Sequence, residues 1–168
     1  LAFLKFPELT LLTDESKRYY SQVHWAARNA DALIALSESA RDDVVQLLGV
    51  KGGKVAVIPA AAGTRFRPPA DPAQARLTAD SRFGLGPNDG GFILFVGTIE
   101  PRKNLTTLLD AYRLLKARGT VSPMPVLAVI GQQGWLFEQV YARVEKLGLQ
   151  DHVYFLHGVD DKSLPVFY

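Results

Sequence analysis

Three short segments in the second half of the chain are apolar along their whole length. These are Phe92–Val96, Val126–Ile130 and Val153–Leu156. A strand that is apolar on both faces has to be buried on both sides, as in a parallel sheet covered by helices. Because longer stretches with helical spacing separate the three segments, the pattern predicts a βαβαβ series typical of an α/β domain.

The stretches between these strands carry apolar residues at intervals of three and four. In the first, over 105–116, the apolar positions are Leu105, Leu108, Leu109 and Tyr112; in the second, over 136–147, they are Leu136, Val140, Val144 and Leu147. Such a stripe lies on one face of a helix. We therefore expect two helices that pack their apolar faces against the sheet.

The first 60 residues show a similar alternation on a smaller scale. A helix is predicted over 14–29, with Asp14 as its cap, and a second over 40–48. The apolar runs 32–36 and 54–58 predict two strands next to these helices. This part of the chain therefore also has the pattern of an α/β domain.

Residues 61–91 differ in amino-acid composition from both flanking parts. They contain four prolines and five glycines in a largely polar stretch. Proline and glycine at this density usually mark loops. The sequence therefore indicates domains over 1–60 and 92–168, joined by an inter-domain linker over 61–91.

Composition narrows the classes of function. The formal net charge is only +2 and basic residues are interspersed with acidic ones, which argues against nucleic acid as the main partner. The absence of cysteine excludes disulfides and Cys-ligated zinc, and it agrees with a cytoplasmic location. Since the longest apolar run, Phe92–Val96, is far shorter than the roughly 20 residues that span a bilayer, we expect at most peripheral membrane contact.

The loop after the first of the three strands, residues 97–104, has the composition of an anion site. Ligands of open parallel sheets bind at the carboxyl ends of the strands. Gly97 lets a ligand approach the backbone, while Arg102 and Lys103 stand where the next helix begins. A helix N-terminus attracts anions, so a diphosphate is the expected ligand. The residues alone are equally compatible with two cations that only face solvent.

The two following strand ends add further candidates at the same edge of the sheet. They carry Gly131 after the second strand and Gly158, Val159, Asp160 and Asp161 after the third. No Gly-x-Gly-x-x-Gly or P-loop motif follows any strand, which disfavours NAD-dependent and P-loop enzymes. The three histidines have no metal-ligand spacing, and of these only His157 directly follows a predicted strand.

The run Phe-Ile-Leu-Phe-Val-Gly-Thr-Ile-Glu-Pro-Arg-Lys-Asn-Leu at 92–105 resembles the first strand and loop of the donor domain in glycosyltransferase family 4. That family is a large group of retaining enzymes with the GT-B fold. Further similar segments occur in the order typical of the family, at 30–38, 57–59, 65–68, 129–131, 134–135 and 153–159.

The resemblance implies an α/β chain of GT-B type that contains parts of two Rossmann-like parallel-sheet domains. Residues 1–60 would be the C-terminal part of the acceptor-side domain, and 92–168 the first half of the donor-binding domain. The implied activity is transfer of a hexose, often mannose, with retention. The donor would be GDP-mannose or a UDP-sugar, and the acceptor a glycan or a lipid-linked saccharide. Neither a metal ion nor another cofactor is implied.

The resemblance also implies roles for single residues. Lys103, helped by Arg102 and beside Gly97 and Thr98, would hold the donor diphosphate; the family commonly has arginine where this chain has Thr98. The stretch around Val159, with Asp160, Asp161, Gly158 and Gly131, would border the nucleotide base.

No catalytic residue is assigned in this chain. The acidic motif that grips the donor sugar in the family is expected after Tyr168, and a histidine of the acceptor domain before Leu1, so we expect little transferase activity from the isolated chain. The alternative is a non-catalytic module that binds a nucleotide or a sugar phosphate.

Overall fold

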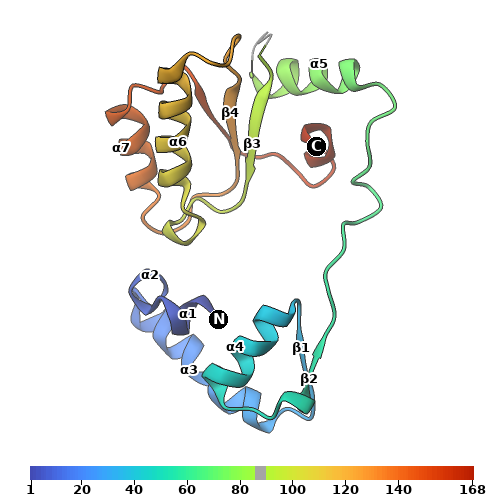
Figure 1. Cartoon of the computed structure of the whole chain (residues 1–168), viewed down its shortest axis with the longest axis vertical. Helices are drawn as coiled ribbons and strands as arrows, with labels where there is room; N and C mark the ends of the chain where they lie inside the picture. Colours follow the sequence, from blue (N-terminus) through green and yellow to red (C-terminus); the bar gives the residue numbers. More distant parts are fainter. Residues whose placement is uncertain (86–89) are drawn as a thin grey trace. The chain divides into compact units, whose positions relative to one another are not determined.

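The computed structural model describes residues 1–85 and 90–168. The chain divides into two compact units, Leu1–Ala62 and Gly63–Tyr168 (Figure 1). Within the described residues, no helix combines the length and the apolar character needed to cross a bilayer.

The first unit consists of helices packed against a small two-stranded parallel sheet. Its elements are α1 (Ala2–Lys5), α2 (Pro7–Thr10), α3 (Asp14–Asn29), β1 (Leu33–Ala35), α4 (Glu38–Leu48), the 3-10 turn η1 (Gly52–Lys54) and β2 (Val55–Val57). Strands β1 and β2 pair in parallel, Leu33 opposite Val55. Asp14 is the first residue of α3, whereas Thr13 is its cap, because the Thr13 hydroxyl accepts a hydrogen bond from the Ser16 N–H.

The sheet of the second unit confirms the predicted parallel α/β arrangement. The strands β3 (Phe92–Val96), β4 (Val126–Ile130) and β5 (Val153–Leu156) lie in the order β3-β4-β5, and both pairs are parallel. Helices α6 (Leu105–Arg118) and α7 (Glu138–Lys146) cover one face. Helix α5 (Pro72–Phe83) and the 3-10 turn η3 (Leu164–Phe167) cover the other (Figure 1).

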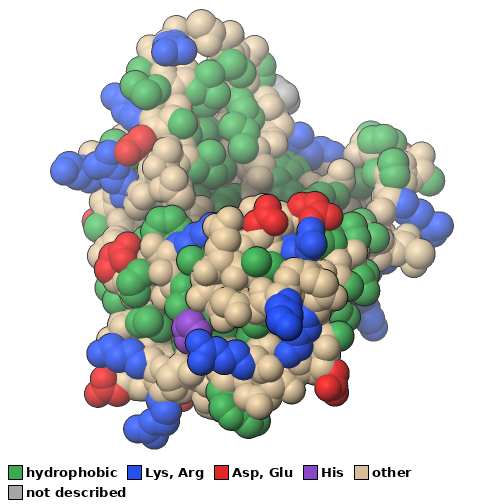
Figure 2. All heavy atoms as spheres, turned by 60° about the horizontal axis from the view of Figure 1, so that its bottom comes forward, with side chains coloured by type: hydrophobic (Ala, Val, Ile, Leu, Met, Phe, Trp, Pro, Cys, Tyr) green, Lys and Arg blue, Asp and Glu red, His purple; other side chains and the backbone are tan. Residues whose placement is uncertain are grey.

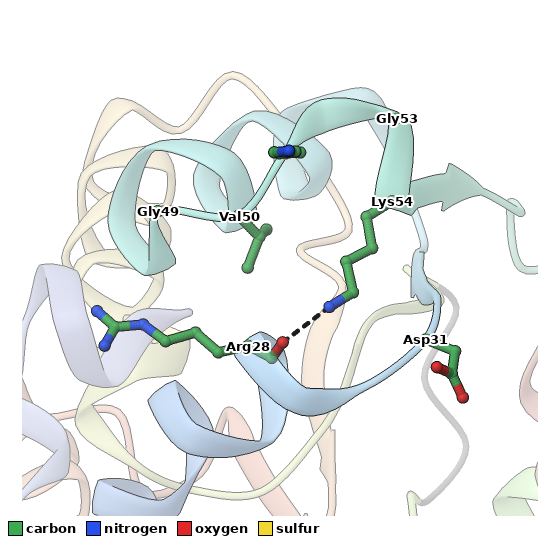
Figure 3. Close-up of a pocket in the computed structure, with 7 residues that line it drawn as sticks. Arg28, Asp31, Gly49, Val50, Gly53 and Lys54 are labelled. Carbon is green, nitrogen blue, oxygen red and sulfur yellow. Dashed lines mark hydrogen bonds between the residues drawn. The ribbon is translucent and has the colours of Figure 1, made fainter.

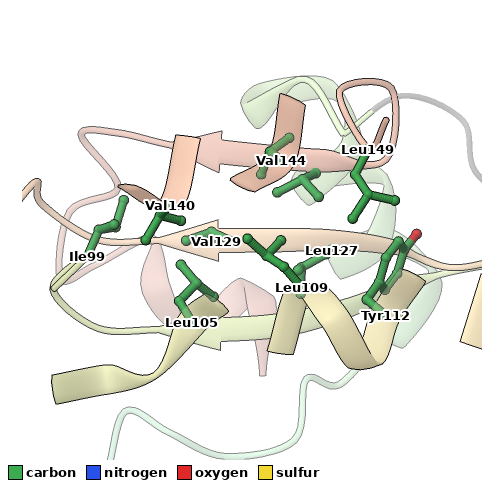
Figure 4. Close-up of a cluster of buried hydrophobic side chains, with 10 residues drawn as sticks. Ile99, Leu105, Leu109, Tyr112, Leu127, Val129, Val140, Val144 and Leu149 are labelled. Carbon is green, nitrogen blue, oxygen red and sulfur yellow. The ribbon is translucent and has the colours of Figure 1, made fainter. Parts of the chain in front are cut away.

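The central strand β4 is buried along its whole length. On the face toward α6 and α7, Leu127 and Val129 have no exposed surface and pack against the predicted helix stripes (Figure 4). The Tyr112 hydroxyl closes the end of this layer by donating to the Pro125 carbonyl at 2.6 Å, and burial raises the pKa of Tyr112. Burial of this kind makes β4 the rigid centre from which the loops of the sheet edge extend.

Two expectations about helices differ from the structure. The stretch 61–91, interpreted as a linker, contains α5, which begins at Pro72 behind the cap Asp71 and buries Ala79; residues 86–89 of the stretch lie outside the described residues. Its proline and terminal glycine are helix-boundary signals, which we misinterpreted as loop signals. The helix expected over 136–147 begins only at Glu138, because Leu136 has a left-handed φ of 55° and lies outside the apolar stripe.

His152, directly before β5, is expected to make the stability of the second unit depend on pH. Burial, followed by the nearby charge of Lys116, lowers the pKa of His152 below its ordinary value of 6.5, while Asp151 opposes this shift. The folded state then binds fewer protons than the unfolded state. This contribution to stability is therefore present above the unfolded pKa and is lost as the pH falls toward the folded one.

We expect the urea midpoint to fall between about pH 7.5 and about pH 5.5 by more in the unaltered chain than in His152→Gln. Measuring both chains at both pH values checks this. Equal losses in the two chains would assign the pH dependence to other groups.

Candidate functional site

The loops after β3 and β4 are joined by main-chain hydrogen bonds beyond the ends of the strands. The Gly97 N–H donates to the Ile130 carbonyl at 2.9 Å, and the Ile99 N–H donates to the Gln132 carbonyl at 2.9 Å. The Gly134 N–H then donates back to the Ile99 carbonyl at 3.0 Å. The carboxyl edge of the sheet is thus a continuous backbone platform rather than two separate loops.

Close approach of these loops explains two glycines. A Cβ atom on Gly131 would lie 2.0 Å from the carbonyl oxygen of Gly97. A Cβ atom on Gly134 would lie 2.7 Å from Cγ2 of Thr98 and 3.1 Å from the carbonyl oxygen of Ile99. Packing between the loops therefore requires Gly131, the glycine that we proposed from the sequence as a neighbour of the nucleotide base.

A tight turn carries the chain from this platform into α6. Residues Pro101–Lys103 form the 3-10 turn η2, and Asn104 then takes a left-handed φ of 52° before the helix starts at Leu105. The Asn104 side chain accepts from the Thr107 hydroxyl at 2.7 Å and caps no backbone N–H. The positive end of α6 is therefore without a side-chain cap at the carboxyl edge of the sheet.

Lys103 lies against the platform. Its Cε atom is 3.8 Å from the position that a Cβ on Gly97 would occupy, so the side chain folds back over that glycine. Lys103 is exposed, and no ion pair is formed with it by any described residue. A cation, a bare glycine backbone and a helix N-terminus thus come together at one place.

Arg102 differs from Lys103 because it already has a partner in the chain. Its Nη2 forms an ion pair with Oε1 of Glu100, whose side chain is only 2% exposed. That oxygen is fully buried and accepts no hydrogen bond with good geometry from any described group. Sequence reasoning missed Glu100, although an acid two residues before the arginine of a cationic loop was a usable signal.

The loop after β5 holds the remaining predicted residues. Gly158 takes a left-handed φ of 75°, and Val159 packs against the α5 side of the sheet. The Asp160 carboxylate accepts from the Ser163 N–H at 2.7 Å, and hydrogen bonding to Ser163 lowers the pKa of Asp160. Asp161 forms an exposed ion pair with Arg65 at 3.2 Å. Both acids therefore have partners within the second unit.

A polar cluster that the sequence did not reveal links the ends of β4 and β5. The Gln133 amide donates to the Tyr141 hydroxyl at 3.2 Å, and that hydroxyl lies 3.2 Å from Nε2 of His157. The Tyr141 ring stacks on Phe155 with ring centroids 4.3 Å apart. Because Tyr141 comes from α7, only the folded chain places it next to the strand ends.

The first unit contains a separate cavity of about 660 Å³ (Figure 3). The residues that line it are Arg28, Asp31, Gly49, Val50, Lys51, Gly53 and Lys54. Asp31 and Lys54 precede β1 and β2, so the cavity lies at the amino ends of these strands. One cation is engaged, since Lys54 Nζ donates to the Arg28 carbonyl at 2.9 Å. Parallel sheets bind ligands at the opposite, carboxyl edge. The platform formed by the loops after β3 and β4 is therefore the better candidate for a ligand site.

The surface charge agrees with the composition. On the face shown in Figure 2, Lys and Arg side chains are distributed together with acidic and hydrophobic ones. On that face, the distribution of charge does not mark a surface for a polyanion.

Comparison with known proteins identifies relatives of the chain. The family described as "Glycosyl transferases group 1" matches residues 78–168. The "O-antigen chain mannosyltransferase B" of Escherichia coli is 25% identical over 155 residues, which are 92% of this chain and 39% of that protein. The "D-inositol 3-phosphate glycosyltransferase" of Jonesia denitrificans is 32% identical over 137 residues, 79% of this chain and 32% of that protein.

A solved structure confirms the fold class. The Anabaena protein Alr3699/HepE, determined in complex with UDP and glucose, superposes with a TM-score of 0.68 at 19% identity, over 97% of this chain and 41% of that one. The fold is thus that of GT-B proteins with parallel-sheet units. The chain spans about two fifths or less of the length of each of these three proteins.

Proposed function

Because the chain belongs to the glycosyl transferases group 1 family, we propose that its β3–β4–β5 edge binds the diphosphate of a nucleotide-sugar donor for hexosyl transfer. The observation that carries the proposal is Lys103, which lies over Gly97 beside the uncapped start of α6. The second unit would be part of the donor-binding domain, and the first unit part of the acceptor-side domain.

The chemistry of glycosyl transfer requires such a site. The bond between the sugar C1 and the diphosphate oxygen breaks, C1 forms a bond to an acceptor hydroxyl oxygen whose proton is released, and negative charge grows on the departing nucleotide. Lys103 and the positive end of α6 would stabilise that charge. Preorganised groups of this kind usually make the largest single contribution to catalysis. We propose that these groups act without a metal ion.

The base would lie beside the loop after β5. Asp160 is engaged with Ser163, so we propose that the backbone of Gly158 and Val159 makes the main contacts. The exposed ion pair of Asp161 with Arg65 is weak and can open to admit a ligand. Gly131 would lie near the base as part of the loop after β4, which packs closely against the loop after β3.

The donor sugar and the acceptor are proposed from the names of similar proteins. Of the three proteins described above, one is called a mannosyltransferase, and the solved structure was determined with UDP and glucose. We propose a hexose donor, either GDP-mannose or a UDP-sugar, and a glycan or lipid-linked acceptor with retention at C1. A cytoplasmic location and at most peripheral membrane contact are part of the same proposal.

Titration of the chain with GDP and with UDP tests the donor site. We expect saturable binding of at least one of them, unchanged by EDTA. The matching nucleosides should bind at least about tenfold more weakly, because they lack the charge-assisted contacts to phosphate. Calorimetry measures all of these affinities. Equal affinity for nucleoside and diphosphate, or no binding of either diphosphate, would contradict the proposal.

A further inference from the structure

Glu100 is an unusual residue for a loop that is proposed to bind an anion. It carries the only acidic side chain of the segment 97–104, and it is one of two polar residues among the buried ones described. A carboxylate this deeply buried is costly unless it is paired. A carboxylate also repels phosphate, so its presence beside the proposed donor site needs a physical reason.

The contacts of Glu100 hold the turn from two sides. Its carboxylate pairs with the Arg102 guanidinium, and its carbonyl accepts from the Lys103 N–H at 3.0 Å. The Asn104 N–H then donates to the Pro101 carbonyl at 3.0 Å. Glu100 therefore holds the turn 101–103 at two points. Its side chain pairs with Arg102, and its carbonyl accepts from the Lys103 N–H.

The charges of the loop follow from these contacts. The charge of Arg102 is balanced by Glu100, while Lys103 has no ion-pair partner among the described residues. Arg102 is still 42% exposed, so burial alone does not keep it from a ligand. The ion pair with Glu100, rather than burial, therefore holds the Arg102 guanidinium against the loop 97–104.

We propose that Glu100 is a positioning residue of the donor site: through Arg102 it fixes the turn 101–103 and so aims Lys103 over Gly97. This inference rests on the proposed function of the platform. Arg102 would then stabilise the loop, and Lys103 would be the side chain that contacts the diphosphate.

A double-mutant cycle distinguishes support from direct contact. The variants are Glu100→Gln, Arg102→Gln and the double variant, with Arg113→Gln on the exposed side of α6 as the matched control. The readout is the dissociation constant for GDP and UDP. If the two residues act as a unit, their effects are not additive.

We expect each single variant to weaken binding about tenfold, since a loosened turn misplaces Lys103, and the double variant to be no weaker than either single variant. Arg113→Gln should bind like the unaltered chain. Normal binding by Glu100→Gln would overturn the inference. The inference would also be overturned if Arg102→Gln reduced nucleotide affinity as much in the Glu100→Gln variant as in the unaltered chain. Arg102 would then contact the ligand directly.

A second cycle, which combines Arg102→Gln with Lys103→Ala, gives an independent test. If Arg102 acts only by positioning Lys103, Arg102→Gln costs little further affinity once the Lys103 side chain is removed, whereas the loss of a direct phosphate contact is the same in either background. We expect the first result, and an undiminished loss in the Lys103→Ala background would overturn the inference. If the unaltered chain binds neither nucleotide, the proposed function fails and this inference fails with it; the other adverse results affect the inference alone.

Discussion

Replacing Gly131 by alanine is expected to destabilise the second unit by about 3 kcal/mol or more, the cost of forcing an atom into a filled space. The added Cβ would lie 2.0 Å from the Gly97 carbonyl oxygen. That neighbour is backbone, and the hydrogen bond from the Gly97 N–H to the Ile130 carbonyl holds the residue in place, so the carbonyl oxygen cannot rotate away. Thermal unfolding should show a fall of roughly 10 °C or more.

Two other glycines provide graded controls. Gly53 has open space around a built Cβ and an ordinary φ, so Gly53→Ala should change stability little. Gly119 also has open space but a left-handed φ of 63°, which should cost about 1 kcal/mol. If Gly131→Ala melted no lower than Gly119→Ala, the loops would be able to separate and the platform would not be rigid.

Lys103→Ala is expected to weaken the binding of GDP or UDP by roughly 10- to 100-fold, the range for a hydrogen bond to a charged group. The side chain is exposed and supports no described ion pair, so the fold should be unaffected. Lys103→Arg keeps the charge and should retain part of the affinity. Calorimetry gives the affinities, and a thermal melt verifies the fold.

Lys116→Ala serves as the charge control, because it removes a lysine near the far end of α6. It should leave nucleotide affinity unchanged. Comparable losses in Lys103→Ala and Lys116→Ala would mean that binding depends on overall charge, and the assignment of Lys103 would then be wrong.

The fold of the second unit was largely predictable because burial on both faces leaves a strong mark in the sequence. The bounds of β3, β4 and β5 agree with the apolar runs. Helix α5 was not found, since its apolar face is narrow and its proline and glycine also occur in loops. Leu136 has the right spacing for α7, but its left-handed backbone excludes it, and spacing alone cannot reveal a backbone angle.

The candidate site was predictable only as a list of residues at strand ends. Gly97, Arg102 and Lys103 come to one edge, as the parallel pattern requires. The pairing of Arg102 with Glu100 and the contacts of Tyr141 with Gln133 and His157 depend on how loops and α7 pack. Such tertiary contacts leave no periodic signal in the sequence.

The main-chain ladder between the loops after β3 and β4 also affects the energetics of ligand capture. Hydrogen bonds from Gly97, Ile99 and Gly134 fix both loops when the unit folds. A loop that is ordered only by its ligand loses conformational entropy at that moment, and the observed affinity falls accordingly. Here the backbone is already ordered, so at the proposed donor site a phosphate would have only the Lys103 side chain left to immobilise.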